Sequence, residues 1–268
     1  MERELIAGLH AAARRYCIDA HAERARRYAA LDQGGGGYDA TSGRYSRSAR
    51  DLFPRYQQLR AMQLAVERFV AEDFTSLADA RRRLSDAIEA AQIDNVAVRA
   101  DPVCSRAAEE ESAALLRHLA ALDEDLLWRT APLPFCRVLS PQETDGRRET
   151  LSARYGVWYG GVVDALPKHA GVPSHLTFVL SRLPDPTGPL QALVAPMAAR
   201  ITELNELTES FELEVVLATF THSEGFWFPA DLGWMVYASH EDTLTVAGEP
   251  LVSAVRAHHA GWLAHLAR

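Results

Sequence analysis

The period of the hydrophobic pattern changes at residues 131–134, where two prolines stand within three positions. Before this segment, apolar side chains recur every three or four positions, as they do in amphipathic helices. After it, several stretches alternate apolar and polar side chains with the period of a strand. Two prolines so close together exclude a helix and favour an extended connector. We therefore expect a helical region over residues 1–131 and an α+β domain over residues 132–268.

Four amphipathic helices are expected before the prolines, and together they predict a helical bundle. The first covers residues 3–31. Asp51, Ser76 and Asp101 are candidate N-caps of the other three, because a short polar side chain at this position can accept a hydrogen bond from the first turn. We expect the fourth helix to continue as far as Trp128.

Four consecutive glycines, at positions 34–37, follow the first expected helix. Residues 32–48 carry too little apolar surface to offset the entropy of ordering them, so they predict an irregular segment. A glycine run can also cradle a phosphate, but the known phosphate-binding loop needs a Lys and a Ser or Thr at fixed positions before a helix. Because residues 32–48 contain no Lys, a plain linker is the expected role.

The part after the prolines predicts a mainly antiparallel sheet flanked by helices, which is an α+β fold. No sheet strand is expected before Pro132. Ser140, followed by Pro141 and by Glu143 three residues later, predicts a capping box at the start of a helix. The expected elements are, in order, this helix at 140–155, strands at 157–163 and 176–180, a helix at 190–204, a strand at 211–217, a hairpin at 232–246 and a closing helix.

Trp234 lies in the middle of the alternating stretch at residues 232–238, which forms the first strand of the expected hairpin. A β-branched run at residues 243–246 follows after a turn of three residues, as in a hairpin. The closing helix is amphipathic and needs an apolar surface to cover. We therefore expect Trp234 to be part of the core.

The chain has a net charge of −8, and most of this charge falls after Thr130. An acidic balance without a basic stripe disfavours nucleic-acid binding, whereas it suits a basic protein partner. No apolar run is long enough to span a membrane, and the first residues are too charged for a signal peptide, so no membrane association and a cytoplasmic location are expected. The sequence does not predict an oligomeric state.

Three cysteines, Cys17, Cys104 and Cys136, are odd in number and widely spaced, which fits neither a disulfide framework nor a zinc cluster. Neither His21 nor His118 has a Glu three residues before it, as the histidines of a di-iron bundle would. The sequence therefore predicts no metal and no cofactor.

The candidate functional residues gather at the turn of the expected hairpin. Ser239, His240 and Glu241 offer a hydroxyl, an imidazole and a carboxylate in succession. Adjacent strand positions point to opposite faces, so Ser239 and His240 cannot act as nucleophile and base. His240 remains as a lone general base or a pH-sensitive contact, with Glu241 beside it. Trp227 and Tyr237 complete the candidate binding set, Trp227 either as an exposed aromatic edge or as a core residue.

Three phrases carry a resemblance: Phe-Pro-Arg-Tyr at 53–56, Arg-Val-Leu-Ser-Pro-Gln-Glu at 137–143 and Asp-Leu-Gly-Trp-Met-Val-Tyr-Ala-Ser-His-Glu at 231–241. They resemble phrases in a group of uncharacterised bacterial proteins, and the resemblance covers most of the chain. It implies that both parts belong to one unit and brings no function with it. The acidic second part is also similar, in architecture alone, to small α+β immunity domains that neutralise bacterial toxins.

Two functions of different class follow from these observations. The first is a non-catalytic intracellular protein of bacterial type that binds a protein partner, with an immunity or defence role. The alternative is a small hydrolase or transferase that uses His240 and Glu241 in a cleft between the two parts. Convergence of His240 and other polar groups on a concave site would favour the enzyme.

Overall fold

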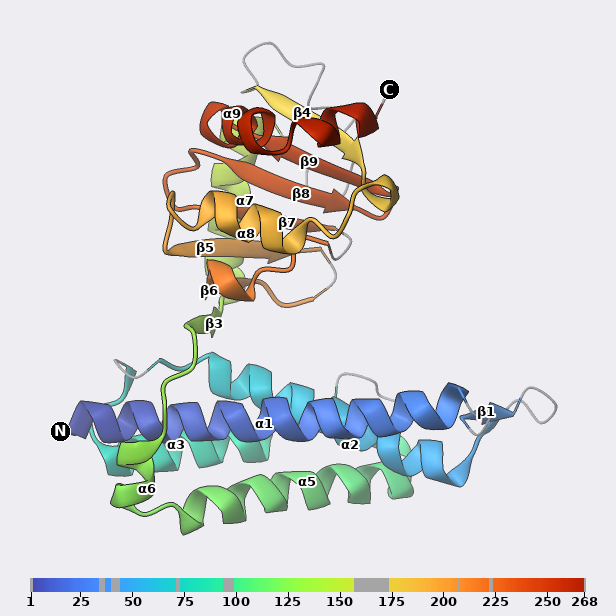
Figure 1. The fold of residues 1–268 in the computed structure, drawn as a ribbon. Helices are drawn as coiled ribbons and strands as arrows, with labels where there is room; N and C mark the ends of the chain where they lie inside the picture. The colour runs from blue at the N-terminus through green and yellow to red at the C-terminus, as the bar shows by residue number, and fades with distance from the viewer. Residues whose placement is uncertain are drawn as a thin grey trace. The chain divides into compact units, whose positions relative to one another are not determined.

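The computed structural model describes residues 2–33, 37–39, 44–70, 73–93, 99–156, 174–206, 208–221 and 224–267. The chain divides into two compact units, Met1–Leu133 and Pro134–Arg268. The first unit is a helical bundle, and the second is an antiparallel sheet flanked by helices (Figure 1). The predicted α+β class, with the bundle before the sheet, is confirmed.

The apolar faces of the bundle helices meet in one core, which includes Leu9, Met62 and Leu115. Such a shared core is what stabilises amphipathic helices, since a single helix has nothing to cover its apolar face. The bundle contains α1 (Glu2–Gln33), α2 (Arg47–Glu67), α3 (Leu77–Ala90), α5 (Pro102–Ala121) and α6 (Glu124–Arg129).

Polar side chains cap α2, α3, α5 and α6, and the cap of α2 differs from the prediction. Ser76 and Asp101 cap α3 and α5 as predicted, accepting hydrogen bonds from the amides of the first turn. The prediction that Asp51 caps α2 is wrong, because Ser46 caps this helix and accepts from Ala49 N. Asp51 lies one turn inside α2, where its carboxylate binds Arg55 at 2.9 Å.

The predicted fourth helix is divided into two. It ends at Ala121, and Asp123 then caps α6 by accepting a hydrogen bond from Leu126 N at 2.8 Å. The break changes the face that the last turn buries: Leu127 enters the core, whereas Leu126 and Trp128 are exposed. A capping Asp inside an apolar stretch therefore overrides the helical period of the leucines.

The glycine segment falls partly outside the described residues, which omit positions 34–36 and 40–43. In the described part, β1 (Tyr38–Asp39) pairs with β2 (Arg44–Tyr45) in an antiparallel ladder. The expectation that no strand precedes Pro132 is therefore wrong for this two-residue pair. The pair is a separate sheet and adds no strand to the main one.

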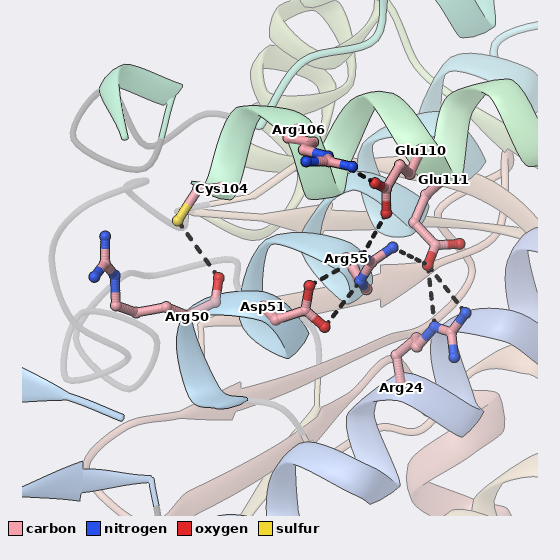
Figure 2. A network of polar contacts seen from close by, with 8 residues as sticks. All are labelled: Arg24, Arg50, Asp51, Arg55, Cys104, Arg106, Glu110 and Glu111. Atoms are coloured by element: carbon pink, nitrogen blue, oxygen red, sulfur yellow. Dashed lines mark hydrogen bonds and ion pairs between the residues drawn. The ribbon is translucent and has the colours of Figure 1, made fainter. Parts of the chain in front are cut away.

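A network of charged side chains joins three bundle helices (Figure 2). Arg55 of α2 binds Glu110 and Glu111 of α5 at 2.7 and 3.3 Å, and Arg24 of α1 binds the same Glu111 at 3.1 Å. Glu111 is buried, so its two arginine partners compensate the loss of its hydration. Hydrogen bonds from Arg55, first to Asp51 and then to Glu110 and Glu111, raise its pKa although burial acts to lower it.

The second unit is built on a seven-stranded sheet in which every neighbouring pair is antiparallel. The predicted hairpin is confirmed as β8 and β9, with residues 240–242 as its turn. The strands follow the order β3 (Cys136–Val138), β6 (Phe211–Glu214), β5 (Arg200–Asn205), β7 (Gly225–Phe228), β8 (Met235–Ser239), β9 (Thr243–Ala247) and β4 (His175–Val179).

The predicted helix at residues 190–204 is wrong in its second half. Helix α8 (Thr187–Val194) stops early, and Ile201 and Leu204 belong to β5. Their spacing of three also fits a helix, but β5 pairs with a strand on each side, β6 and β7. Tertiary pairing decides between two patterns that the local sequence allows. The strand predicted at 157–163 lies outside the described residues.

Helices cover both faces of the sheet (Figure 1). On one face α7 (Pro141–Tyr155) packs Leu151 and Tyr155 against Phe226 and Met235. On the other face lie α8, α9 (Glu249–His258) and the 3-10 helix η5 (Ala260–His265). All five residues of β8 are consequently buried. The predicted capping box of Ser140 at the start of α7 is confirmed.

Trp234, directly before β8, is 2% exposed, which confirms the expectation that it is part of the core. We predict that Trp234→Ala destabilises the second unit by about 3–5 kcal/mol, because it removes a large buried side chain and leaves a cavity. Trp128→Ala is the control, since Trp128 is an exposed tryptophan of the first unit. Denaturant unfolding of both variants measures the difference. Equal unfolding midpoints for Trp234→Ala and the parent protein would contradict the burial.

Candidate functional site

The structure separates the four predicted site residues by burial. His240 and Glu241 are exposed in the turn between β8 and β9, whereas Trp227 of β7 and Tyr237 of β8 are buried. Trp227 is 0% exposed and donates its indole N–H to Glu203 Oε2 at 2.7 Å. The suggestion that Trp227 forms an exposed aromatic edge is therefore wrong.

Glu224, which the sequence analysis missed, brings the polar groups of the turn together. Its Oε2 accepts a hydrogen bond from the Tyr237 hydroxyl at 2.7 Å. Its Oε1 accepts from His240 N at 2.9 Å and also contacts His240 Nδ1. The Ser239 hydroxyl lies 3.5 Å from the same oxygen. One carboxylate thus binds three residues at the end of β8.

The register of two strands places Glu224 at this position. Gly225 of β7 pairs with Ala238 of β8, so the residue before Gly225 lies beside the residues that follow Ala238. Glu224 has a positive φ of 60°, a conformation that is uncommon outside glycine. Its partners are 13 to 16 positions away in the sequence, a separation that local patterns do not reveal.

The cluster shifts the pKa values of its members. Burial acts to raise the pKa of Glu224, but hydrogen bonds from His240 N, the Tyr237 hydroxyl and the His240 ring outweigh it and leave the pKa below 4.5. Burial and the hydrogen bond to Glu224 raise the pKa of Tyr237. The same carboxylate raises the pKa of His240 above 6.5, first through the hydrogen bond and then through its charge. A larger share of His240 is therefore cationic near neutral pH than for a free histidine.

Glu224 and His240 form a carboxylate–imidazole pair, but the arrangement lacks other parts of a catalytic site. The predicted pairing of His240 with Glu241 is not the one formed, because the hydrogen-bond partner of the ring is Glu224. The His240 side chain is 72% exposed, so its surroundings do not exclude water. The Ser239 hydroxyl contacts Glu224 and accepts a hydrogen bond from Glu241 N, and neither contact activates it as a nucleophile.

Acidic side chains surround this cluster. We call Glu206, Glu224, Glu241 and Asp242 the acidic turn surface. Glu206 N donates to the Glu224 carbonyl at 3.3 Å, and the charge of Glu206 contributes to the raised pKa of His240. The carboxylate of Asp242 accepts a hydrogen bond from Ser181 N at 2.8 Å. The turn is thus held on one side by Glu224 and on the other by Asp242.

Within the described ranges, no three His, Cys, Asp or Glu side chains are grouped so that they could hold a metal ion. Cys17 and Cys104 are buried free thiols, and Cys136 is half-buried. No helix in the described part of the chain is long and apolar enough to cross a membrane.

No protein-family model, no curated protein and no solved structure matches this chain. The resemblance to the bacterial group therefore stays a prediction.

The Glu224–His240 pair makes the free energy of unfolding depend on pH. The raised pKa of His240 means that its contribution to stability is complete below about pH 6.5 and is lost as the pH rises through the folded-state pKa. The lowered pKa of Glu224 means that its contribution is present above about pH 4.5 and is lost as the pH falls through the folded-state pKa. The pair therefore stabilises the fold most between these two values.

We predict that Glu224→Gln lowers the pKa of His240 toward 6.5, because the variant removes the carboxylate that favours the imidazolium. An NMR titration of the His240 ring in both proteins measures this shift. Glu241→Gln is the control, since Glu241 acts on His240 only through its charge and should change the midpoint less. Identical midpoints in the parent and Glu224→Gln would contradict the pairing.

Proposed function

We propose that this is a non-catalytic, intracellular protein of bacterial type that binds a basic protein partner through the acidic turn surface. The observation that carries the proposal is the way Glu224 holds the turn, with one carboxylate bound to Tyr237, Ser239 and His240. A surface that is ordered before binding loses less entropy when a partner docks. Exposed carboxylates at its rim attract a basic partner and speed its association.

Charge favours a basic partner over an acidic or nucleic-acid one. Glu241 and Asp242 are exposed beside the cluster, and the chain has a net charge of −8. His240 adds a positive group that Glu224 largely balances. The acidic turn surface therefore keeps a negative balance even when His240 is protonated. A cytoplasmic location belongs to this proposal.

Binding is favoured over catalysis because the polar groups of the turn satisfy one another. A catalytic base needs a substrate proton within hydrogen-bond reach in a site that excludes water. His240 is exposed, and Glu224 already uses its oxygens for Tyr237 and the amide of His240. Polar groups that hydrogen-bond one another in this way stabilise the conformation of the turn and do not promote a reaction.

The similarity of architecture to small immunity domains suggests a class of partner. Acidic α+β domains of that kind neutralise toxins, and a basic toxin would suit the acidic turn surface. We propose an immunity or defence role on this basis, which is an analogy of fold and charge.

Charge reversal at Glu241 tests the proposal. Glu241 is exposed, and its side chain forms no hydrogen bond or ion pair with the residues that the structure describes, so Glu241→Lys should fold normally. We expect a partner that is recovered with the parent protein from cells of its source to be lost with Glu241→Lys. Glu149→Lys provides the control, because Glu149 is exposed on α7 and makes the same change of charge outside the acidic turn surface.

Titration calorimetry with the purified partner then measures the affinities. Reversing one rim charge should weaken binding by roughly tenfold and make it less sensitive to salt. Equal affinities for the Glu241→Lys and Glu149→Lys variants would refute the proposed surface. Turnover of a small substrate that is lost in His240→Ala would instead support the enzyme alternative.

A further inference from the structure

Five arginines line a pocket in the helical unit. The pocket has a volume of about 1010 Å³, which is at the upper end of the range typical of small-molecule sites. Two carboxylates, Asp51 and Glu110, also line it. The arginines are Arg27, Arg47, Arg50, Arg55 and Arg106.

Three of these arginines are already paired, as Figure 2 shows for Arg55 and Arg106. Arg106 binds Glu110 at 3.1 Å, Arg50 binds Asp101 at 2.6 Å, and Arg55 binds three carboxylates. These pairs hold the guanidinium groups in position without a ligand. The wall of the pocket is therefore formed by ordered side chains from α2 and α5.

The other two arginines, Arg27 of α1 and Arg47 of α2, are exposed and form no hydrogen bond or ion pair within the ranges that the structure describes. They provide two positive charges that no carboxylate of these ranges neutralises. A guanidinium group has a planar set of donors that matches phosphate oxygens in a bidentate contact. Two such groups in one pocket suit a ligand with at least two negative charges.

The start of α2 adds backbone donors to the same pocket. Arg47 and Ser48, the first two residues of this 21-residue helix, line the pocket. Ser46 caps the amide of Ala49 and leaves the amides of Arg47 and Ser48 without an intrahelical acceptor. Amides at this end of a helix favour a phosphate group. At α5, by contrast, Asp101 already accepts from Val103 N.

We propose that this pocket binds a small phosphorylated molecule with two or more phosphate groups. Arg27 and Arg47 contact the phosphates, the first amides of α2 complete the site, and Arg50 and Arg106 form its wall. The site is independent of the acidic turn surface and of the function proposed for it. We assign an anionic ligand because arginines outnumber carboxylates in the lining of the pocket, although the protein as a whole is acidic.

Inorganic pyrophosphate is the probe that tests the site, by titration calorimetry at constant ionic strength in a buffer without phosphate or sulfate. We expect one molecule to bind, and Arg27→Gln/Arg47→Gln to weaken binding by roughly tenfold or more, because charge-assisted hydrogen bonds are lost. The control is Arg26→Gln/Arg117→Gln, which makes the same change of charge at exposed positions of α1 and α5 outside the pocket. Thermal melts establish that both double variants are folded.

Four outcomes would overturn the proposal. The first is the absence of pyrophosphate binding to the parent protein at millimolar concentration. The second is equal weakening by the two double variants, which would show attraction by overall charge alone. The third is equal affinity for orthophosphate, which would remove the requirement for two phosphates. The fourth is displacement of pyrophosphate by a single-stranded RNA oligonucleotide that binds more tightly through Arg27 and Arg47, which would assign the pocket to a macromolecule.

Discussion

Every residue of β8, near the middle of the sheet, is buried between helices on both faces. A polar group in such a strand needs a hydrogen-bond partner, because leaving it without one costs about 1–3 kcal/mol. Trp227 of β7 and Tyr237 of β8 meet this need with a carboxylate. Trp227 donates to Glu203, and Tyr237 donates to Glu224. The buried Tyr237 hydroxyl needs an acceptor, and the Glu224 carboxylate provides it at the end of the strand. The same carboxylate accepts a hydrogen bond from His240 N in the turn.

The acidic turn surface of the second unit and the arginine-lined pocket of the first unit carry charge of opposite sign. In the sheet unit, carboxylates surround a turn that Glu224 and Asp242 hold in place. In the bundle, arginines gather in a pocket, and ion pairs with neighbouring carboxylates position most of them. Each surface uses internal charge pairs to fix its geometry and leaves other charges exposed. This division is the physical basis for proposing a protein partner for one unit and a phosphorylated ligand for the other.

Local chemistry explains which parts of this structure were predictable from the sequence. Ser76, Asp101 and Ser140 were recognised as caps because a cap acts on amides two or three residues away. The end of α8 and the start of β5 were not, because Ile201 and Leu204 have a helical spacing and β5, buried on both faces, shows no alternation. His240 and Tyr237 were identified as candidates, but Glu224 was missed. Its role depends on the register of β7 against β8, which no short stretch of sequence specifies.

The central claim is that Glu224 orders the acidic turn before any partner binds, and amide hydrogen exchange at His240 tests it most directly. The His240 amide donates to Glu224 Oε1 at 2.9 Å on an exposed residue, so this hydrogen bond is its only protection among the described contacts. The account predicts slow exchange in the parent protein and fast exchange in Glu224→Gln, with the amides of β8 protected in both. Exchange of the His240 amide in the parent protein at the rate of an unstructured peptide would contradict it.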